Sequence, residues 1–351
     1  KLDLCAGAPP DMYASQGQRW GMPTNDWDAI AGDGYRYLRE KLACAQLIYD
    51  IIRIDHVVGL FRIWSIPVSE PHDTHGLNGF FDPGDEAKWG EHGRRILSVM
   101  LESSGMLFCA EDLGTVPDVC REAMAEFGIP GNDVQRWTKD WDRRHDFLPP
   151  DEYRPLSVAM LSTHDTTNWA AWWRYEAGTV DEGLFKRKCA DRGIDFEAVK
   201  SRLFDLEESA HGRLRWKEEV SSPETLTHVL GRAAHEVRDF VDMYLNTYDE
   251  KGKLWRQLGF KGKAKEKADR KLIGAMIRHS ARSRAVFCIE QLMDWALYAG
   301  LIPGDPYDYR INRPGTVDAG NWSQRIPVAL EDLVRDPVNK EIKKLIASTG
   351  R

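Results

Sequence analysis

Three carboxylic acids in this sequence each follow a short apolar run. Asp55 follows IIRI, Glu111 follows LFCA, and Asp165 comes shortly after SVAML. A single acid in such a place is more often a helix cap or part of a loop ion pair than a catalytic group. Three acids at the ends of successive apolar runs favour a shared site, because parallel α/β folds gather functional groups at the carboxyl ends of their strands.

The neighbours of these acids indicate different roles. Strand alternation places Arg53 on the same face as Asp55, and a guanidinium beside a carboxylate favours the ionised form that a nucleophile needs. Glu111 follows an apolar strand, an environment that raises a carboxyl pKa and suits a general acid. His164 stands beside Asp165 as a hydrogen-bond donor. Two carboxylates in opposed environments, with a third for orientation, are suited to breaking a glycosidic bond.

Tryptophan is abundant near these acids. The chain has 13 Trp residues, and we expect at least half of them to fill the core. Sugar rings stack on flat aromatic faces, so the tryptophans near the acids are also candidates for saccharide contacts. These candidates are Trp20, Trp64, Trp169, Trp172 and Trp173.

Five runs predict the strands that must position the acids. They are IIRIDH (51–56), GMLFCAEDL (105–113), VQRW (134–137), SVAMLSTHD (157–165) and AVFCIEQL (285–292). Helical patterns accompany them, and we expect helices over about 33–49, 116–126 and 227–248. Strands that alternate with helices predict an α/β fold with a parallel sheet.

Two segments stand apart from this alternation. Glycine and proline interrupt any period in residues 1–30, which we expect to form a loop region. Segment 174–283 is long and charged, and it reads as a helical insertion. Its basic run at 261–271 is interleaved with acids, which favours a solvated face over a binding patch.

Composition excludes several classes of protein. The 351 residues are 42% hydrophobic, enough to bury a sizeable core, and the net charge of −7 argues against a nucleic-acid or anionic-membrane partner. No run approaches the ~20 apolar residues of a membrane span. The six cysteines form no C-x-x-C pair, which favours free thiols and a cytoplasmic location. We find no motif for a metal or a cofactor and expect neither.

Five motifs together resemble glycoside hydrolase family 77, the 4-alpha-glucanotransferases or amylomaltases. They span nearly the whole chain in the family's order. They are GAPPDMYASQGQRWGMPTNDW (7–27), RIDHVVGLFRIWSIP (53–67), FCAEDLGTVPDVCREAMAEFGIPG (108–131), LSTHDTTNWAAWW (161–173) and RINRPGTVDAGNWSQR (310–325).

The resemblance implies a role for each matching residue. Asp55 resembles the nucleophile, Glu111 the acid/base, and Asp165 the carboxylate that grips and distorts the donor sugar. The positions that resemble substrate-binding residues are Arg53, His56, His164, Trp20, Gln18 and Asn312. The implied reaction transfers alpha-1,4-glucan segments with retention, and the implied partners are alpha-1,4-glucans, maltooligosaccharides and glucose. Residues 1–30 are expected to cover the substrate.

Two departures from the family pattern concern the acceptor. Val57-Val58-Gly59 stands where many members have Phe-Arg-Gly, and resembles variants that act with branched or heteroglycan acceptors. The insertion at 174–283 is also longer than in compact amylomaltases. Both leave the acceptor preference open.

A third departure concerns the fold. The family has a (β/α)8 TIM barrel, and IIRIDH resembles its fourth strand. We therefore expect the whole chain, 1–351, to be the C-terminal portion of the catalytic domain, with strands four to eight. An N-terminal segment of the same enzyme would supply the first three strands. Two alternatives to a transferase stay open: a retaining hydrolase of the alpha-amylase clan, and a non-catalytic glucan-binding fragment.

Overall fold

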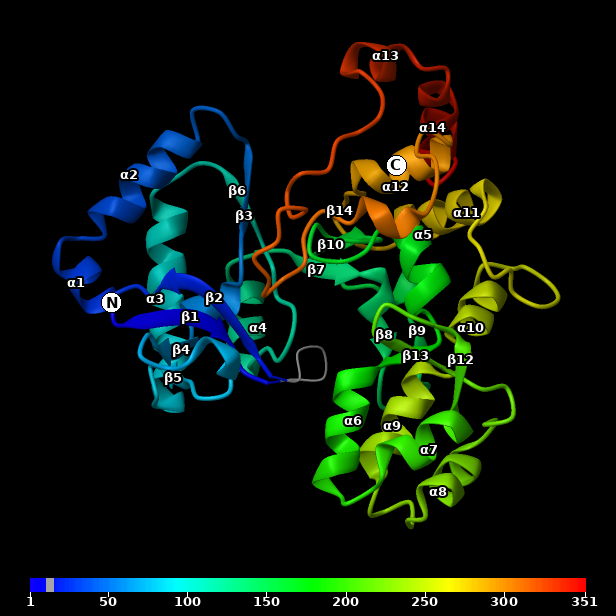
Figure 1. Ribbon diagram of the computed structural model, residues 1–351. Helices are drawn as coiled ribbons and strands as arrows, with labels where there is room; N and C mark the ends of the chain where they lie inside the picture. The colour runs from blue at the N-terminus through cyan, green and yellow to red at the C-terminus, as the bar shows by residue number, and fades with distance from the viewer. Residues whose placement is uncertain (11–15) are drawn as a thin grey trace.

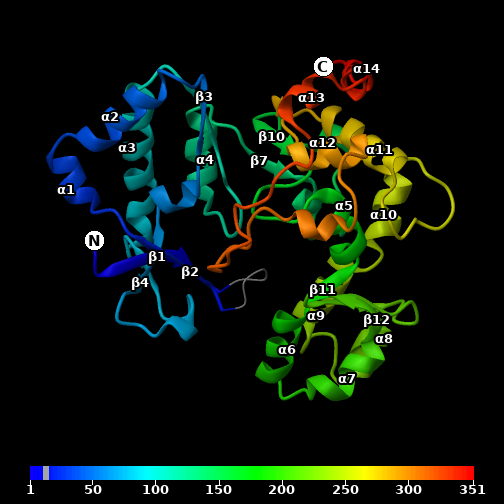
Figure 2. The same cartoon turned by 45° about the horizontal axis from the view of Figure 1, so that its top comes forward.

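The computed structural model describes residues 1–10 and 16–351. Residues 11–15, which belong to the motif at 7–27, lie outside this description. The described chain forms two lobes (Figures 1 and 2). The first lobe holds the helices and strands of residues 1–10 and 16–126, and the second holds those from residue 131 onward.

Five short parallel strands run through both lobes. They are β3 (Ile51–Ile54), β6 (Leu107–Ala110), β7 (Gly131–Val134), β10 (Ser157–Met160) and β14 (Phe287–Cys288). β3 pairs with β6, and β10 lies between β7 and β14. The two groups are joined where the Ala110 N–H donates to the Pro130 carbonyl at 2.8 Å. The predicted parallel α/β arrangement is therefore confirmed.

The strand predicted at 134–137 is misplaced. The strand is β7, and Gln135–Trp137 form a 3-10 turn. The sequence Gly-Asn-Asp has little strand propensity, but burial and pairing with β10 impose the strand. Gly131 is required there, because an added Cβ would lie 2.4 Å from the Asp112 carboxylate.

The expectation of a loop over residues 1–30 is wrong. This segment contains β1 (Leu4–Ala8), β2 (Gln18–Pro23) and α1 (Trp27–Gly32). Both strands join an antiparallel sheet with β4 (Ile63–Pro67) and β5 (Phe80–Asp82), in the order β2-β1-β4-β5. Local periodicity could not reveal β1, because it is held by pairing with β4, some sixty residues along the chain.

Segment 174–283 contains both helices and strands. Its antiparallel sheet is formed by β11 (Thr179–Asp181), β13 (Arg213–Trp216) and β12 (Phe204–Ala210), which the expectation of helix missed. The helix expected at 227–248 is two helices, because the chain leaves α8 through Gly231, at a φ of +63°, before α9 begins at Arg238. A separate apolar cluster around Phe185, Phe204 and Phe240 holds this segment together.

Helices pack around the parallel strands, and the apolar core lies between them. In the first lobe α3 and α4 cover β3 and β6, while in the second lobe α5 and α11 surround a tryptophan-rich cluster. Helices expected near 33–49 and 116–126 are confirmed with shorter bounds. The helices are α1 (Trp27–Gly32), α2 (Arg36–Ala45), α3 (Trp89–Glu102), α4 (Asp118–Glu126), α5 (Trp169–Ala171), α6 (Glu182–Asp191), α7 (Phe196–Leu203), α8 (Pro223–Leu230), α9 (Arg238–Thr247), α10 (Glu250–Gln257), α11 (Arg270–Ala281), α12 (Leu292–Ala299), α13 (Leu330–Arg335) and α14 (Val338–Ala347).

Two further observations bear on the class of protein. No helix in the described part of the chain is long and apolar enough to cross a membrane. All six cysteines are free.

Candidate active site

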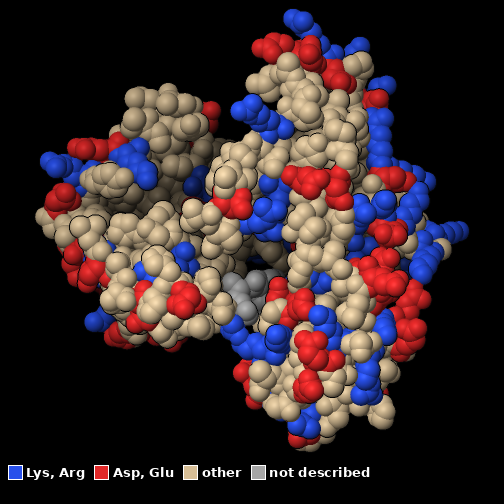
Figure 3. Space-filling model, viewed as in Figure 1, with Lys and Arg blue, Asp and Glu red and all other residues tan. Residues whose placement is uncertain are grey.

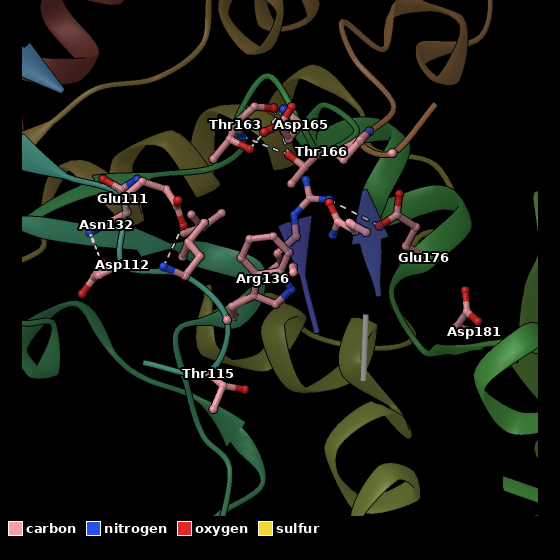
Figure 4. Close-up of a pocket in the computed structure, with 18 of the residues that line it drawn as sticks. Glu111, Asp112, Thr115, Asn132, Arg136, Thr163, Asp165, Thr166, Glu176 and Asp181 are labelled. Carbon is pink, nitrogen blue, oxygen red and sulfur yellow. Dashed lines mark hydrogen bonds and ion pairs between the residues drawn. The ribbon is translucent and has the colours of Figure 1, made fainter. Parts of the chain in front are cut away.

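A large cavity lies where the two lobes face each other. Its volume is about 1100 Å³. Trp20, Arg53, His56 and Glu111 line it from the first lobe, and Asp165 lines it from the second. Figure 3 shows the surface hollowed between the lobes, and Figure 4 shows Glu111 and Asp165 on its wall. Ligand sites for small molecules commonly span roughly 300–1,000 Å³, so this cavity has room for an extended ligand.

Glu111 stands directly after β6 and is half-buried. Its Oε1 accepts the Leu113 N–H at 2.8 Å, and its Oε2 accepts the His56 N–H at 2.9 Å. Burial raises the pKa of Glu111, although these two hydrogen bonds and the Arg53 charge favour the ionised form. The predicted direction of this pKa shift is confirmed. The carboxyl group faces the cavity in a fixed orientation and can hold a proton there.

Asp55 is placed beside Glu111 by the register of two strands. Ile54 of β3 pairs with Ala110 of β6, so the residue that follows in each strand is an acid. Adjacent strands are about 4.8 Å apart, and the two acids therefore leave the sheet side by side. Arg53 Nη1 contacts Asp55 Oδ1 at 2.6 Å, as the sequence predicts. Arg53 lines the cavity. The Asp55 side chain is exposed and does not line the cavity.

His56 connects the acids with the segment expected to cover the substrate. Its backbone is left-handed, with a φ of +44°, and this turn directs its N–H at Glu111. Its ring meets the Trp20 ring edge-on at 4.9 Å, and Trp20 Nε1 donates to Gln18 Oε1 at 2.9 Å. Burial lowers the pKa of His56 to about 4, so the imidazole is neutral near pH 7. Gln18, Trp20 and His56 are thus brought together, and all three line the cavity.

Asp165 is held by donors from two segments. Asn312 Nδ2 donates to Asp165 Oδ1 at 2.7 Å, and His164 Nε2 lies 3.3 Å from Oδ2. Burial alone would raise the Asp165 pKa, but these two hydrogen bonds outweigh it and hold the pKa below its usual value. The contact with Asp165 raises the pKa of His164. His164 and Asn312 do not line the cavity themselves, but they fix a carboxylate that does.

Several residues of this site were not predicted. Arg136 is buried and donates to the Thr167 carbonyl at 2.6 Å and to Glu176 at 3.3 Å, and all three line the cavity. In the sequence, the position of Arg136 within the run VQRW (134–137) was the available sign of a buried arginine. Trp322 packs on His164 with ring centroids 5.1 Å apart, and it stands within the motif at 310–325.

Some tryptophans expected near the saccharide are core residues instead. Trp169 and Trp173 are fully buried and stack on each other at 5.4 Å. Trp172 is also buried, although it borders the cavity, while Trp20 and Trp64 are more accessible and line it. Closeness to Asp165 in the sequence does not distinguish a tryptophan of the core from one that lines the cavity.

The described residues contain no group of three or more metal-ligating side chains that could hold an ion. The cavity and the strand ends beside it offer three carboxylates in different environments, of which Glu111 and Asp165 line the cavity. Burial raises the pKa of Glu111, Arg53 contacts Asp55, and hydrogen bonds from His164 and Asn312 fix Asp165 and lower its pKa. This combination supports acid–base and nucleophilic chemistry on a neutral polar substrate.

Comparison with known proteins agrees with this site. The family model described as 4-alpha-glucanotransferase, that of glycoside hydrolase family 77, matches residues 1–330. A 4-alpha-glucanotransferase of Chlamydia caviae is 41% identical over 170 residues, which are 48% of this chain and 31% of that protein. Another, from Chlamydia trachomatis, is 29% identical over 328 residues, 93% of this chain and 47% of that protein. The chain therefore spans less than half the length of these two relatives.

Solved structures show the same fold. The amylomaltase from Streptococcus agalactiae in complex with acarbose matches with a TM-score of 0.59 at 18% identity, over 99% of this chain and 51% of that one. The amylomaltase from Corynebacterium glutamicum also matches at 0.59, with 22% identity, over 98% of this chain and 42% of that one. These likenesses show an α/β fold of the amylomaltase type.

Proposed function

The chain belongs to glycoside hydrolase family 77, the 4-alpha-glucanotransferases, and we propose that it transfers alpha-1,4-glucan segments to the 4-hydroxyl of another glucan or of glucose. The observation that carries this proposal is the register of β3 and β6, which sets Asp55 and Glu111 at neighbouring strand ends. Asp165 lines the same cavity as Glu111. Two carboxyl groups on neighbouring strands suit a retaining double displacement.

In the first half of the reaction Asp55 attacks the anomeric carbon. The bond to the departing glycosidic oxygen breaks, and Glu111 gives that oxygen its proton. Burial raises the pKa of Glu111, which favours its protonated form, while Arg53 Nη1 contacts Asp55 Oδ1 at 2.6 Å and orients that carboxylate. A covalent beta-glucosyl intermediate results, and the shortened glucan leaves with a free 4-hydroxyl.

In the second half Glu111 acts as base. It removes the proton of an incoming sugar 4-hydroxyl, whose oxygen attacks the anomeric carbon and releases Asp55. Asp165, held ionised by His164 and Asn312, would grip donor-sugar hydroxyls through its oxygens. The Gln18–Trp20 segment lies against His56 and would hold the acceptor while it excludes water.

Incubation with maltotriose tests the proposal. A transferase yields glucose together with maltopentaose and longer oligosaccharides, whereas a retaining hydrolase yields only shorter sugars. Asp55→Asn keeps the size of the side chain and should abolish turnover. Binding of maltooligosaccharides without turnover by the unaltered protein would instead support a glucan-binding role. Substantial turnover by the Asp55→Asn variant would assign the nucleophile elsewhere.

We further infer that the five parallel strands correspond to strands four to eight of a (β/α)8 barrel. Within the described residues, β3 and β14 each pair with a single parallel neighbour. Both edges carry exposed apolar side chains, Ile51 on β3 and Val286 and Ile289 beside β14. Such edges suit pairing with further strands. Hydrogen exchange tests this, because slow exchange of the amides of 51–54 is expected when another strand covers β3, and fast exchange would contradict it.

We also propose a cytoplasmic location, which the six free thiols support.

A further inference from the structure

Two aromatic rings from distant segments lie face to face at the cavity. His211 stands at the tip of the β12–β13 hairpin, with a φ of +54°, and Tyr307 lies in the short helix Pro306–Tyr309. Their ring centroids are 3.5 Å apart and their planes differ by 8°. Tyr175 meets both rings edge-on, at 4.8 Å from His211 and 5.6 Å from Tyr307. We call His211 and Tyr307 the aromatic platform.

Hydrogen bonds hold the platform in place. Asp305 Oδ1 accepts the Tyr307 N–H at 2.9 Å, and Asp305 Oδ2 contacts both the Tyr175 hydroxyl and Arg174. The segment that bears Tyr307 is therefore anchored to the segment that bears Tyr175. A surface fixed before its ligand arrives loses less conformational entropy on binding.

The platform belongs to the same cavity as the carboxylates. His211 and Tyr307 line it together with Glu176 and Arg213. Figure 4 shows Glu176 on the far side of Arg136 from Glu111, so the cavity continues well beyond the acid/base. The segment after Tyr307 returns to the acids, because Arg310 donates to the Asp165 carbonyl at 3.1 Å.

The chemistry of this part of the cavity suits a sugar ring. A flat aromatic face packs against the C–H face of a pyranose, and charged side chains bind its hydroxyl groups. Glu176 supplies carboxylate oxygens, and Arg213 is oriented by hydrogen bonds to Thr179 at 2.9 and 3.0 Å. His211 is exposed and Tyr307 half-buried. Because the two rings cover each other on one side, a sugar would stack on an outer face of the pair.

We propose that the aromatic platform binds a glucose unit of an alpha-glucan at a distance from the three carboxylates. This inference rests on the proposed function, since it assigns a subsite to the same substrate class. The proposal requires that a glucan in contact with both places contain more glucose units than maltotriose. Long maltooligosaccharides therefore gain a contact that short ones do not reach, and the platform selects for glucan length.

Truncation of Tyr307 tests this selection. Tyr307→Ala should weaken binding of maltoheptaose about tenfold, as expected when one aromatic anchor is removed, and leave binding of maltotriose within about twofold. Calorimetric titration with each sugar measures both values, and KM for the two donors should follow the same pattern. Tyr307→Phe keeps the ring and should retain the preference for the longer sugar. Tyr309→Ala is a matched control, since Tyr309 belongs to the same short helix but packs in an apolar cluster with Met293.

A second variant guards against loss of folding. His211 is exposed at a hairpin tip, so His211→Ala should leave thermal unfolding unchanged while it lowers maltoheptaose affinity. Equal losses for maltotriose and maltoheptaose, or no loss in either variant, would overturn the proposal and leave the platform as a structural contact. Failure of the proposed function gives a different result. The unaltered protein would then form no oligosaccharide longer than maltotriose, whatever its binding preference.

Discussion

The ends of β6 and β14 present the same kind of residue in two different settings. Glu111 directly follows β6, and Glu290 comes two residues after β14. Both side chains are half-buried, and burial is the main cause that raises the pKa of each. By strand position and pKa shift alone, the two glutamates would be equal candidates for an acid/base.

Their contacts separate them. Glu111 lines the cavity and receives backbone N–H groups from His56 and Leu113. Glu290 does not line the cavity, accepts the Leu161 N–H at 2.7 Å, and has the buried Asp294 as a charged neighbour. A glutamate whose pKa is raised at a strand end can therefore face the cavity, as Glu111 does, or serve a structural contact, as Glu290 does. Glu290 connects the segment after β14 to the segment after β10 through its hydrogen bond with Leu161.

The largest expected effect separates the two glutamates by activity. Glu111→Gln should lower kcat for maltotriose disproportionation by about 10³-fold, because an amide cannot supply the proton that the leaving oxygen needs. Glu290→Gln should stay within about threefold of the unaltered protein, since the amide oxygen can still accept the Leu161 N–H. Single-turnover kinetics on both variants measures this. A large loss in the Glu290 variant would remove the distinction between the two strand ends.

The pH dependence of stability should also distinguish the two glutamates, and here the larger effect is expected at Glu290. The pKa of Glu290 is about 7 in the fold, against about 4.3 in an unfolded chain. Between these values the folded state binds more protons, so this group makes the free energy of unfolding fall as pH rises. Glu290→Gln removes the titration, and its stability relative to the unaltered protein should be higher at pH 8 than at pH 5 by about 2 kcal/mol.

Urea unfolding at the two pH values measures this difference. Glu331→Gln, an exposed substitution in α13, provides the matched control and should leave the pH dependence unchanged. A flat or reversed difference for Glu290→Gln would mean that the carboxyl is not held protonated at the end of β14.

Sequence patterns could predict the strand ends but not which of them open to the cavity. Asp55, Glu111 and Asp165 were found because each follows an apolar run, yet Glu290 follows such a run too. The choice between them depends on contacts such as Leu161 with Glu290, between residues more than a hundred positions apart. Non-local pairing likewise hid β1, and the left-handed turn at His56 that directs its N–H at Glu111 has no signature in the sequence.

Asp165, which follows β10, extends the comparison, because its hydrogen bonds lower the pKa of the carboxyl group and favour the ionised form. Asn312→Ala removes the 2.7 Å hydrogen bond to Asp165, and kcat/KM should fall about tenfold, since a hydrogen bond to a charged group contributes about 1.5 kcal/mol or more. Asn339→Ala, which loses a hydrogen bond of 2.7 Å to Leu333 in the remote C-terminal helices, should leave kcat/KM unchanged. Equal effects of the two substitutions would indicate general destabilisation.

The smallest expected effect concerns the charged neighbours of the two glutamates. Arg53 lowers the pKa of Glu111, whereas Asp294 raises that of Glu290. Arg53→Met removes a charge that favours ionised Glu111, so the Glu111 pKa should rise further. Because the general acid must be protonated, the alkaline limb of the kcat/KM profile should move to higher pH. Arg53→Lys keeps the charge and should leave that limb in place, although both variants lose maximal activity through the contact with Asp55. If the limb moved to lower pH in the methionine variant, the group that titrates there would not be an acid beside a cation, and Glu111 would lose its assigned role.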